Sequence, residues 1–192
     1  KHIGDIAQKL NDAGAAITAY RDALTIDPQF AMVRYQLARV LMSRQQWKEA
    51  EAELLAALDA VPTYAEASLT LAELLRSVHR ADEALPLLVE LLQRDPYHFD
   101  ALIALGEILL DLGRKEHATT AFTRVLRFDP SHAGALYHEG VMLAAQHRYR
   151  EAIDRWSRVI SEAPESDFAR RARRQLRSAD DLQRIFGARI AS

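Results

Sequence analysis

Apolar residues recur along this chain at the three- and four-residue spacing of a helix face, and the pattern itself repeats. One stretch shows the spacing with Leu37, Leu41, Leu54, Leu55 and Leu58. Such spacing predicts amphipathic helices rather than strands. The pattern breaks at a short polar stretch and then resumes, so we expect two helices to follow one another before the chain turns.

Prolines mark the period of this pattern. Five of the six prolines are 34 residues apart: Pro28, Pro62, Pro96, Pro130 and Pro164. A fixed period of this length is typical of a repeated supersecondary unit. Because proline cannot continue a helix and holds the preceding residue extended, we expect each proline to separate one helical pair from the next.

Three further positions keep the period: an alanine, a tiny residue and a large apolar residue. The alanines are Ala16, Ala50, Ala84, Ala118 and Ala152. The tiny residues are Gly4, Ala38, Ala72, Gly106 and Gly140. The large residues are Tyr20, Leu54, Leu88, Phe122 and Trp156. We expect the tiny residues to let two helices approach closely while the large residues fill the facing space.

Each unit also has a break between its two helices. The break residues are Asn11, Gln45, His79, Gly113 and His147. Glycine, asparagine and histidine tolerate the left-handed conformation that ends a helix, so each unit is predicted to be helix, tight turn, helix and proline. Pro86 is the one proline outside the period, and we expect it to kink a second helix or delay its start.

A 34-residue helix–turn–helix unit with these small residues and a closing proline resembles the tetratricopeptide repeat (TPR). The pairs Leu37-Ala38, Leu71-Ala72 and Leu105-Gly106 carry the resemblance, although Glu139 stands where the family has an aliphatic residue. The resemblance implies an all-α, right-handed α-solenoid of TPR repeats with a C-terminal capping helix. The expected array covers 1–166, with a truncated repeat at 1–30, full repeats at 31–64, 65–98, 99–132 and 133–166, and the capping helix and tail at 167–192.

The resemblance also implies a non-enzymatic scaffold whose first helices line a concave groove for a partner peptide or domain. By analogy, the groove candidates are Met32, Tyr35, Arg39, Met42, Glu66, Leu69, Glu73, Arg76, Asp100, Ile103, Glu107, Leu110, Tyr137 and Val141. Some TPR domains clamp a C-terminal carboxylate with Lys and Asn on successive first helices. Here the Asn residues are missing, and Asp5 and Glu73 would repel a carboxylate, so no chaperone-tail clamp is expected.

Charge is unevenly distributed along a chain whose net charge is only −2. Residues 65–112 hold nine acidic residues and three arginines, which favours a partner segment with basic and apolar residues. Residues 168–192 hold seven arginines and two aspartates. Within them, the candidate basic contact surface is Arg170, Arg171, Arg174 and Arg177. We favour a capping helix with arginines paired to nearby acids, because no aromatic residues interleave as nucleic-acid stacking platforms.

The residues indicate no catalytic chemistry. The chain has no cysteine, its seven histidines show no metal-ligand spacing, and no glycine-rich phosphate loop occurs. We therefore expect no cofactor, metal or catalytic residue. No apolar run is long enough to span a bilayer, which argues against a membrane partner. The net charge of −2 argues against a nucleic-acid partner.

Two functional classes remain open at this stage. The favoured class is a protein-interaction scaffold, and the alternative is a structural, self-associating or substrate-recruiting segment of a larger multidomain protein. A weaker third class is nucleic-acid or membrane binding through the terminal arginines. The chain begins at Lys1 without a methionine, so we expect it to be a piece of a longer protein. Its compartment and oligomeric state stay open, with a soluble, cytoplasmic protein as the default expectation.

Overall fold

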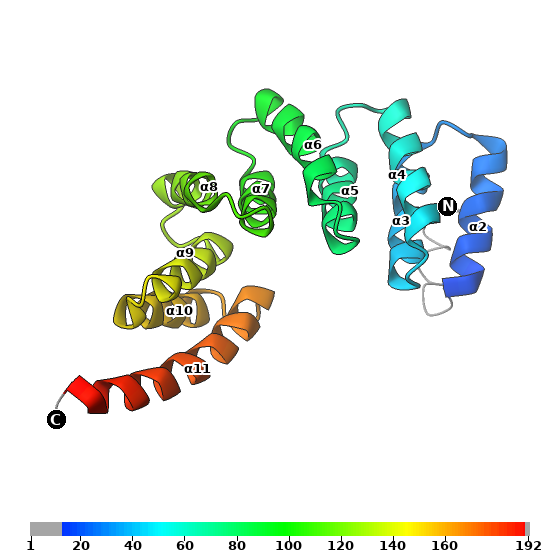
Figure 1. Ribbon diagram of the computed structural model, residues 1–192. Coiled ribbons are helices and arrows are strands. Elements are labelled where there is room, and N and C mark those ends of the chain that lie inside the picture. The colour runs from blue at the N-terminus through cyan, green and yellow to red at the C-terminus, as the bar shows by residue number, and fades with distance from the viewer. Residues whose placement is uncertain (1–12, 191–192) are drawn as a thin grey trace. The chain divides into compact units, whose positions relative to one another are not determined.

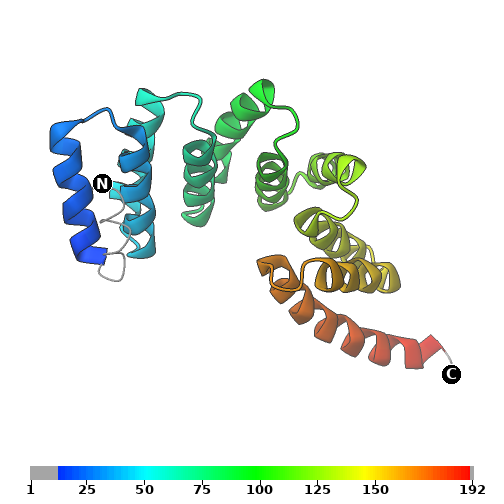
Figure 2. The ribbon, with the colours of Figure 1, turned by 180° about the vertical axis from the view of Figure 1, so that it is seen from behind.

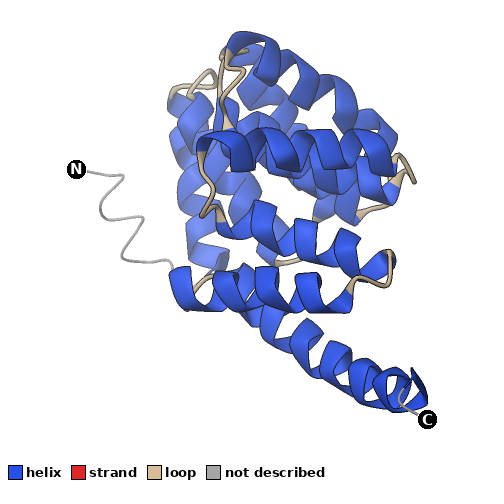
Figure 3. Ribbon diagram, turned by 90° about the vertical axis from the view of Figure 1, so that its left-hand side faces the viewer, coloured by secondary structure: helices blue, strands red, loops and turns tan. Residues whose placement is uncertain are grey.

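The computed structural model describes residues 13–190, and within that range all regular structure is helical, with no strand (Figures 1 and 3). The predicted all-α class is confirmed. The helices are α2 (Ala13–Ile26), α3 (Ala31–Ser43), α4 (Trp47–Ala60), α5 (Ala65–Ser77), α6 (Ala81–Arg94), α7 (Phe99–Asp111), α8 (Lys115–Phe128), α9 (Ala133–Ala145), α10 (Tyr149–Glu162) and α11 (Asp167–Ile190).

The chain divides into two compact units, Lys1–Pro96 and Tyr97–Ser192, which we call unit 1 and unit 2. In unit 1, α3 pairs with α4 and α5 pairs with α6, while α2 packs on α3 and α4 packs on α5. Each helix thus packs on its neighbours in the chain, as in a stack of helical hairpins.

Unit 2 repeats this arrangement and adds a longer last helix (Figure 2). The helix α7 pairs with α8, α9 pairs with α10, and α8 packs on α9. The helix α11 has 24 residues, against 13 in α9, and it packs on both α10 and α9. Its position at the end of the stack is the one expected of a capping helix.

The turn inside each hairpin has a left-handed residue at the predicted break. The positive φ angles are 61° at Gln45, 62° at His79, 73° at Gly113 and 62° at His147. At the first of these turns, the N–H of Gln46 donates to the carbonyl of Leu41 at 2.9 Å, and the N–H of Gln45 donates to that of Met42 at 2.9 Å. This pair of bonds is the Schellman motif, which satisfies carbonyls at the helix end. The prediction is confirmed at these four breaks, and Asn11 lies outside the described residues.

The periodic prolines follow the second helix of each hairpin. The helices α2, α4, α6, α8 and α10 each end two residues before one of them. The intervening residue leaves the helical conformation, and at Asp95, with φ −125° and ψ 90°, it is extended. Pro86 lies inside α6, which begins at Ala81, so a delayed helix start is wrong. Its missing N–H removes one hydrogen bond of the helix, the one to the carbonyl of Asp82.

Small and large residues face each other in the core as predicted. The five periodic alanines from Ala16 to Ala152 are fully buried. A Cβ atom added to Gly106 would lie 2.4 Å from the ring of Phe122, and one added to Gly140 would lie 2.5 Å from the indole of Trp156. These two hairpins therefore need glycine because an aromatic ring occupies the space of a side chain. Gly4, the corresponding residue of the first repeat, lies outside the described residues.

Candidate interaction surface

The groove candidates of unit 1 come from the first helices of its two full hairpins, and we call them the unit 1 wall. They are Met32, Tyr35, Arg39 and Met42 of α3 and Glu66, Leu69, Glu73 and Arg76 of α5. Met32 is 49% exposed and so presents a large apolar side chain to solvent. Arg39, Glu66 and Glu73 are also exposed, and the other four are half-buried. The unit 1 wall thus presents apolar and charged atoms together.

An aromatic pair links the two helices of the unit 1 wall. The ring centroids of Tyr35 and Tyr64 lie 5.2 Å apart, and the guanidinium carbon of Arg39 lies 5.7 Å from the centroid of Tyr35. Tyr64 immediately precedes α5. Burial raises the pKa of Tyr64, Glu66 and Tyr35 raise it further, and Arg39 opposes them. The phenol therefore stays protonated at neutral pH and keeps its hydrogen-bond donor.

The acidic residues of the unit 1 wall differ in their ion pairing from acidic residues on the second helix α4. Within the described chain, Glu66 and Glu73 form no ion pair. On the second helix α4, by contrast, Glu53 pairs with Arg34 at 2.7 Å and Glu51 pairs with Arg80 at 2.8 Å. A cation from a partner could therefore reach the two wall carboxylates without displacing one that is already bound.

The groove candidates of unit 2 are much less accessible. Asp100 is exposed, while Glu107, Leu110 and Val141 are half-buried. Ile103 and Tyr137 are only 6% and 8% exposed, so the expectation that these two face outward is wrong. The ring of Tyr137 lies 5.8 Å from that of Phe168 on α11. The terminal helix thus covers a position that the repeat pattern alone assigns to an open surface.

A polar cluster joins α7, α9 and α11 in unit 2. The Nε2–H of His138 donates to Oε1 of Glu107 at 2.8 Å, and Nη1 of Arg171 lies 3.6 Å from the same oxygen. His138 is 6% exposed, and its ring stacks on Phe122 with centroids 4.6 Å apart. Sequence reasoning missed this cluster and assigned His138 no role. The available signal lay in His138, which stands where three other repeats have Gln36, Thr70 and Ala104, whereas Glu107 matches Glu73.

The basic surface of α11 is partly occupied by internal partners. Asp167 accepts bonds from Arg170 at 3.1 Å and forms an ion pair with Arg171 at 2.6 Å. The guanidinium carbon of Arg171 also lies 5.5 Å from the centroid of Phe168. Arg174 and Arg177 are exposed. The expected pairing of arginines with nearby acids is thus confirmed for Arg170 and Arg171.

The described residues hold no group of three or more histidine, aspartate or glutamate side chains arranged to bind a metal ion. A search for membrane-spanning helices over the same part of the chain finds none that combines the required length and apolarity.

Residues 7–74 and 75–139 each match the sequence model of the tetratricopeptide repeat. The chain belongs to the tetratricopeptide repeat family. Proteins of the TPR family are generally non-enzymatic scaffolds that bind protein or peptide partners. A comparison with curated proteins finds no match.

Solved structures of TPR proteins are similar to this chain over most of its length. YrrB, described as a TPR protein with an unusual peptide-binding site, is 25% identical, with a TM-score of 0.65 and 88% of each chain covered. A TPR protein from Parabacteroides merdae is 18% identical, with a TM-score of 0.77, 97% of this chain and 75% of that chain covered. TTC0263 from Thermus thermophilus is 20% identical, with a TM-score of 0.70 and coverages of 92% and 95%. The similarity to the Parabacteroides merdae protein and to TTC0263 shows only that the fold is shared.

Proposed function

We propose that this TPR protein is a non-enzymatic scaffold and that its unit 1 wall holds a partner segment with basic and apolar residues. One observation carries the proposal. The wall has an exposed Met32 together with two carboxylates, Glu66 and Glu73, that have no internal cation within the described chain.

The apolar part of the unit 1 wall suits the side chains of a bound peptide. Methionine has a flexible and polarizable side chain that adapts to different partner groups. Tyr35 adds a rigid aromatic surface, and its ring contacts both Tyr64 and Arg39. Interfaces commonly use such aromatic residues as their main contacts.

The charged part of the unit 1 wall favours a partner segment with positive charge. A lysine or arginine in a bound segment would neutralise Glu66 or Glu73 without breaking an existing ion pair. Complementary charge of this kind increases the association rate and excludes wrong partners. Arg39 restricts the site further, because a second basic group placed beside it would be repelled.

Similarity to YrrB supports a peptide as the ligand, since that protein is described as having a peptide-binding site.

The test uses a fluorescein-labelled peptide that alternates lysine with leucine and methionine. We expect it to bind the protein in an anisotropy titration, and we expect Glu66→Lys with Glu73→Lys to weaken binding at least tenfold. The matched control is Asp22→Lys with Asp59→Lys, which changes the charge equally on the exposed surfaces of α2 and α4. Circular dichroism checks that both variants fold.

Equal loss of affinity in the control would contradict the proposal, because net charge alone would then explain binding. Unchanged affinity in the wall variant would contradict it as well. If gel filtration at several concentrations instead shows a dimer that Tyr35→Ala with Glu73→Lys dissociates, the wall is a self-association surface.

A further inference from the structure

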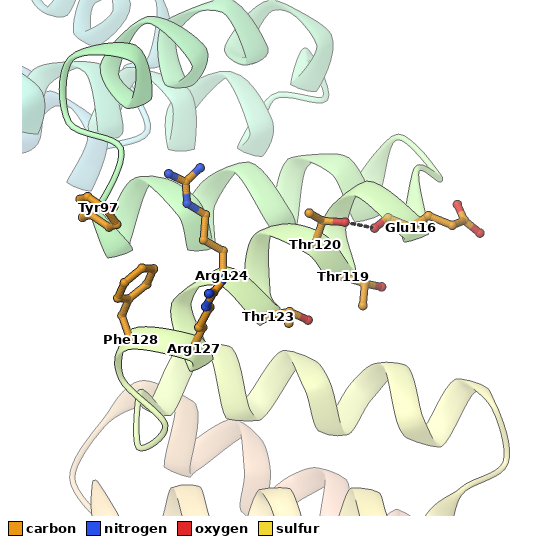
Figure 4. A pocket seen from close by; sticks show the side chains of 8 residues that line it. All are labelled: Tyr97, Glu116, Thr119, Thr120, Thr123, Arg124, Arg127 and Phe128. Carbon is orange, nitrogen blue, oxygen red and sulfur yellow. Dashed lines mark hydrogen bonds between the residues drawn. The ribbon is translucent and has the colours of Figure 1, made fainter.

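A second surface of the molecule lies on the exposed side of α8 in unit 2, and we call it the α8 pocket (Figure 4). It has a volume of about 710 Å³. Tyr97 and Phe128 form one end, Arg124 and Arg127 follow, and Thr123 and Glu116 lie toward the other end. No groove candidate of the sequence analysis belongs to it.

The aromatic end of the α8 pocket is exposed rather than packed. Tyr97 and Phe128 are 57% and 52% exposed, yet their rings meet edge to face with centroids 4.9 Å apart. Contiguous exposed apolar surface often marks a contact site, and these two adjoining rings form such a surface. Packing inside unit 2 therefore does not explain these two rings.

The other repeats provide an internal comparison. The residues equivalent to Tyr97, one after each periodic proline, are Gln29, Thr63, Ser131 and Glu165. The residues equivalent to Phe128, two before each proline, are Ile26, Ala60, Arg94 and Glu162. The repeat fold thus forms without aromatic residues at either position, and only the hairpin between Pro96 and Pro130 has an aromatic residue at both.

Two arginines stand beside the rings without an acidic partner. Within the described part of the chain, neither Arg124 nor Arg127 forms an ion pair, and the guanidinium carbon of Arg124 lies 5.8 Å from the centroid of Tyr97. Arg158, equivalent to Arg124 in the next repeat, does have such a partner, Glu162, at 3.3 Å. Both pocket arginines are exposed, so their charges face solvent.

The threonines of the pocket contribute little charge selectivity. The hydroxyl of Thr120 donates to the carbonyl of Glu116 at 3.0 Å (Figure 4). The hydroxyl of Thr119 donates to the carbonyl of Lys115 at 2.9 Å. These donors are therefore already used within α8. The strong recognition groups that remain are the two guanidinium groups, the two rings and the carboxylate of Glu116, which lies at the opposite end of the pocket from the rings (Figure 4).

We propose that the α8 pocket binds an acidic segment of a partner protein, one that places an apolar or aromatic side chain next to one or two carboxylates. The guanidinium groups of Arg124 and Arg127 bind the carboxylates through charge-assisted, bidentate hydrogen bonds. The apolar side chain packs on Tyr97 and Phe128. Charge complementarity selects this occupant, and the site is separate from the unit 1 wall, which selects the opposite charge.

The test uses the whole chain and a fluorescein-labelled peptide in which glutamate and aspartate flank a central tryptophan and leucine. We expect Arg124→Glu with Arg127→Glu to weaken binding at least tenfold. We expect Tyr97→Ser with Phe128→Ala, which introduces residues found at the equivalent positions, to weaken it about fivefold. Arg44→Glu with Arg150→Glu is the matched control, because both arginines are exposed elsewhere. It should retain the affinity of the parent protein.

Three outcomes would overturn the proposal. The first is unchanged affinity in both pocket variants. The second is equal binding of a peptide in which glutamine and asparagine replace the acids. The third is preferential binding of a single-stranded oligonucleotide, because phosphates rather than a protein segment would then be the ligand. The Glu66→Lys, Glu73→Lys variant should bind the acidic peptide at least as well as the parent chain does, which separates this proposal from that for the unit 1 wall.

Discussion

The two units use the same repeat position for opposite purposes. Glu73 on α5 and Glu107 on α7 are one period apart, 34 residues, and each comes directly after its helix's periodic tiny residue. Glu73 is exposed and has no ion pair in the described chain. The side chain of Glu107 is only 13% exposed and contacts His138 and Arg171. One carboxylate faces solvent, while the other joins side chains of α9 and α11.

The difference arises from the helices that pack near each first helix. In unit 2, α11 supplies Phe168 against Tyr137 and Arg171 near Glu107. In unit 1, Tyr35 contacts Tyr64 and Arg39 but stays half-buried, and Glu73 forms no ion pair within the described chain. A repeat position therefore has no fixed function, and its neighbours decide whether it binds or packs.

Reversing the charge at Glu107 and at Glu73 is the most direct test of the difference between the two positions. We expect Glu107→Lys to lower the free energy of unfolding by about 2–4 kcal/mol, since a new cation would face Arg171 and leave His138 without its acceptor. Glu73→Lys should change it by less than about 0.5 kcal/mol, as is usual at exposed sites. Urea unfolding of both variants measures the difference, and equal effects would show that the two positions are not distinct.

A smaller effect is expected from the glycine of the second hairpin of unit 2. Gly140→Ala should destabilise the protein by about 1–3 kcal/mol, because the new methyl group overlaps Trp156 and outweighs the better helix propensity of alanine. Adding Trp156→Leu reproduces the Ala38 and Leu54 combination of unit 1. Thermal unfolding of both single variants and the double variant checks this. A double variant whose loss equals the sum of the two single losses would argue against direct contact as the cause.

The smallest expected effect is a pH-dependent change in stability caused by Asp129, in the turn between α8 and α9. The hydroxyl of Ser131 donates to Asp129 at 2.7 Å and its N–H at 3.0 Å, and these bonds hold the pKa of Asp129 below its usual value. A lowered carboxyl pKa stabilises the fold above the pKa of the unfolded chain, and the stabilisation is lost as pH falls through the folded value. We therefore expect Asp129→Asn to reduce stability slightly at pH 7 and not at pH 2. An equal difference at both pH values would rule out titration as its origin, and Ser131→Ala should reproduce part of the loss.

The sequence was a good guide to the parts of the fold that depend on one repeat. Proline spacing located the helix ends, and the break residues located the left-handed turns, because both effects act within a few residues. The contact of Gly106 with Phe122 was predictable for the same reason. Burial of Tyr137 was not, since it depends on Phe168, which lies beyond the last full repeat.

The surfaces also differ in whether the sequence of one repeat is enough to predict them. The exposed unit 1 wall follows from helix periodicity, whereas the Glu107–His138–Arg171 cluster needs three helices in place. The α8 pocket left a signal in the sequence: Tyr97 and Phe128 are aromatic where the other repeats are mostly polar or small. Comparing repeats for such departures, rather than for agreement, would have found it.

The close fit of Gly106 to Phe122, and of Gly140 to Trp156, has a consequence for how such an array changes over time. Each glycine and its aromatic ring lie within one 34-residue segment. A duplication or recombination event that moves whole segments carries both members of the fit together. An exchange point between the two helices of a hairpin would separate them, leaving either a clash or an empty space. Gene rearrangements are therefore expected to be tolerated at the prolines and selected against at the tight turns.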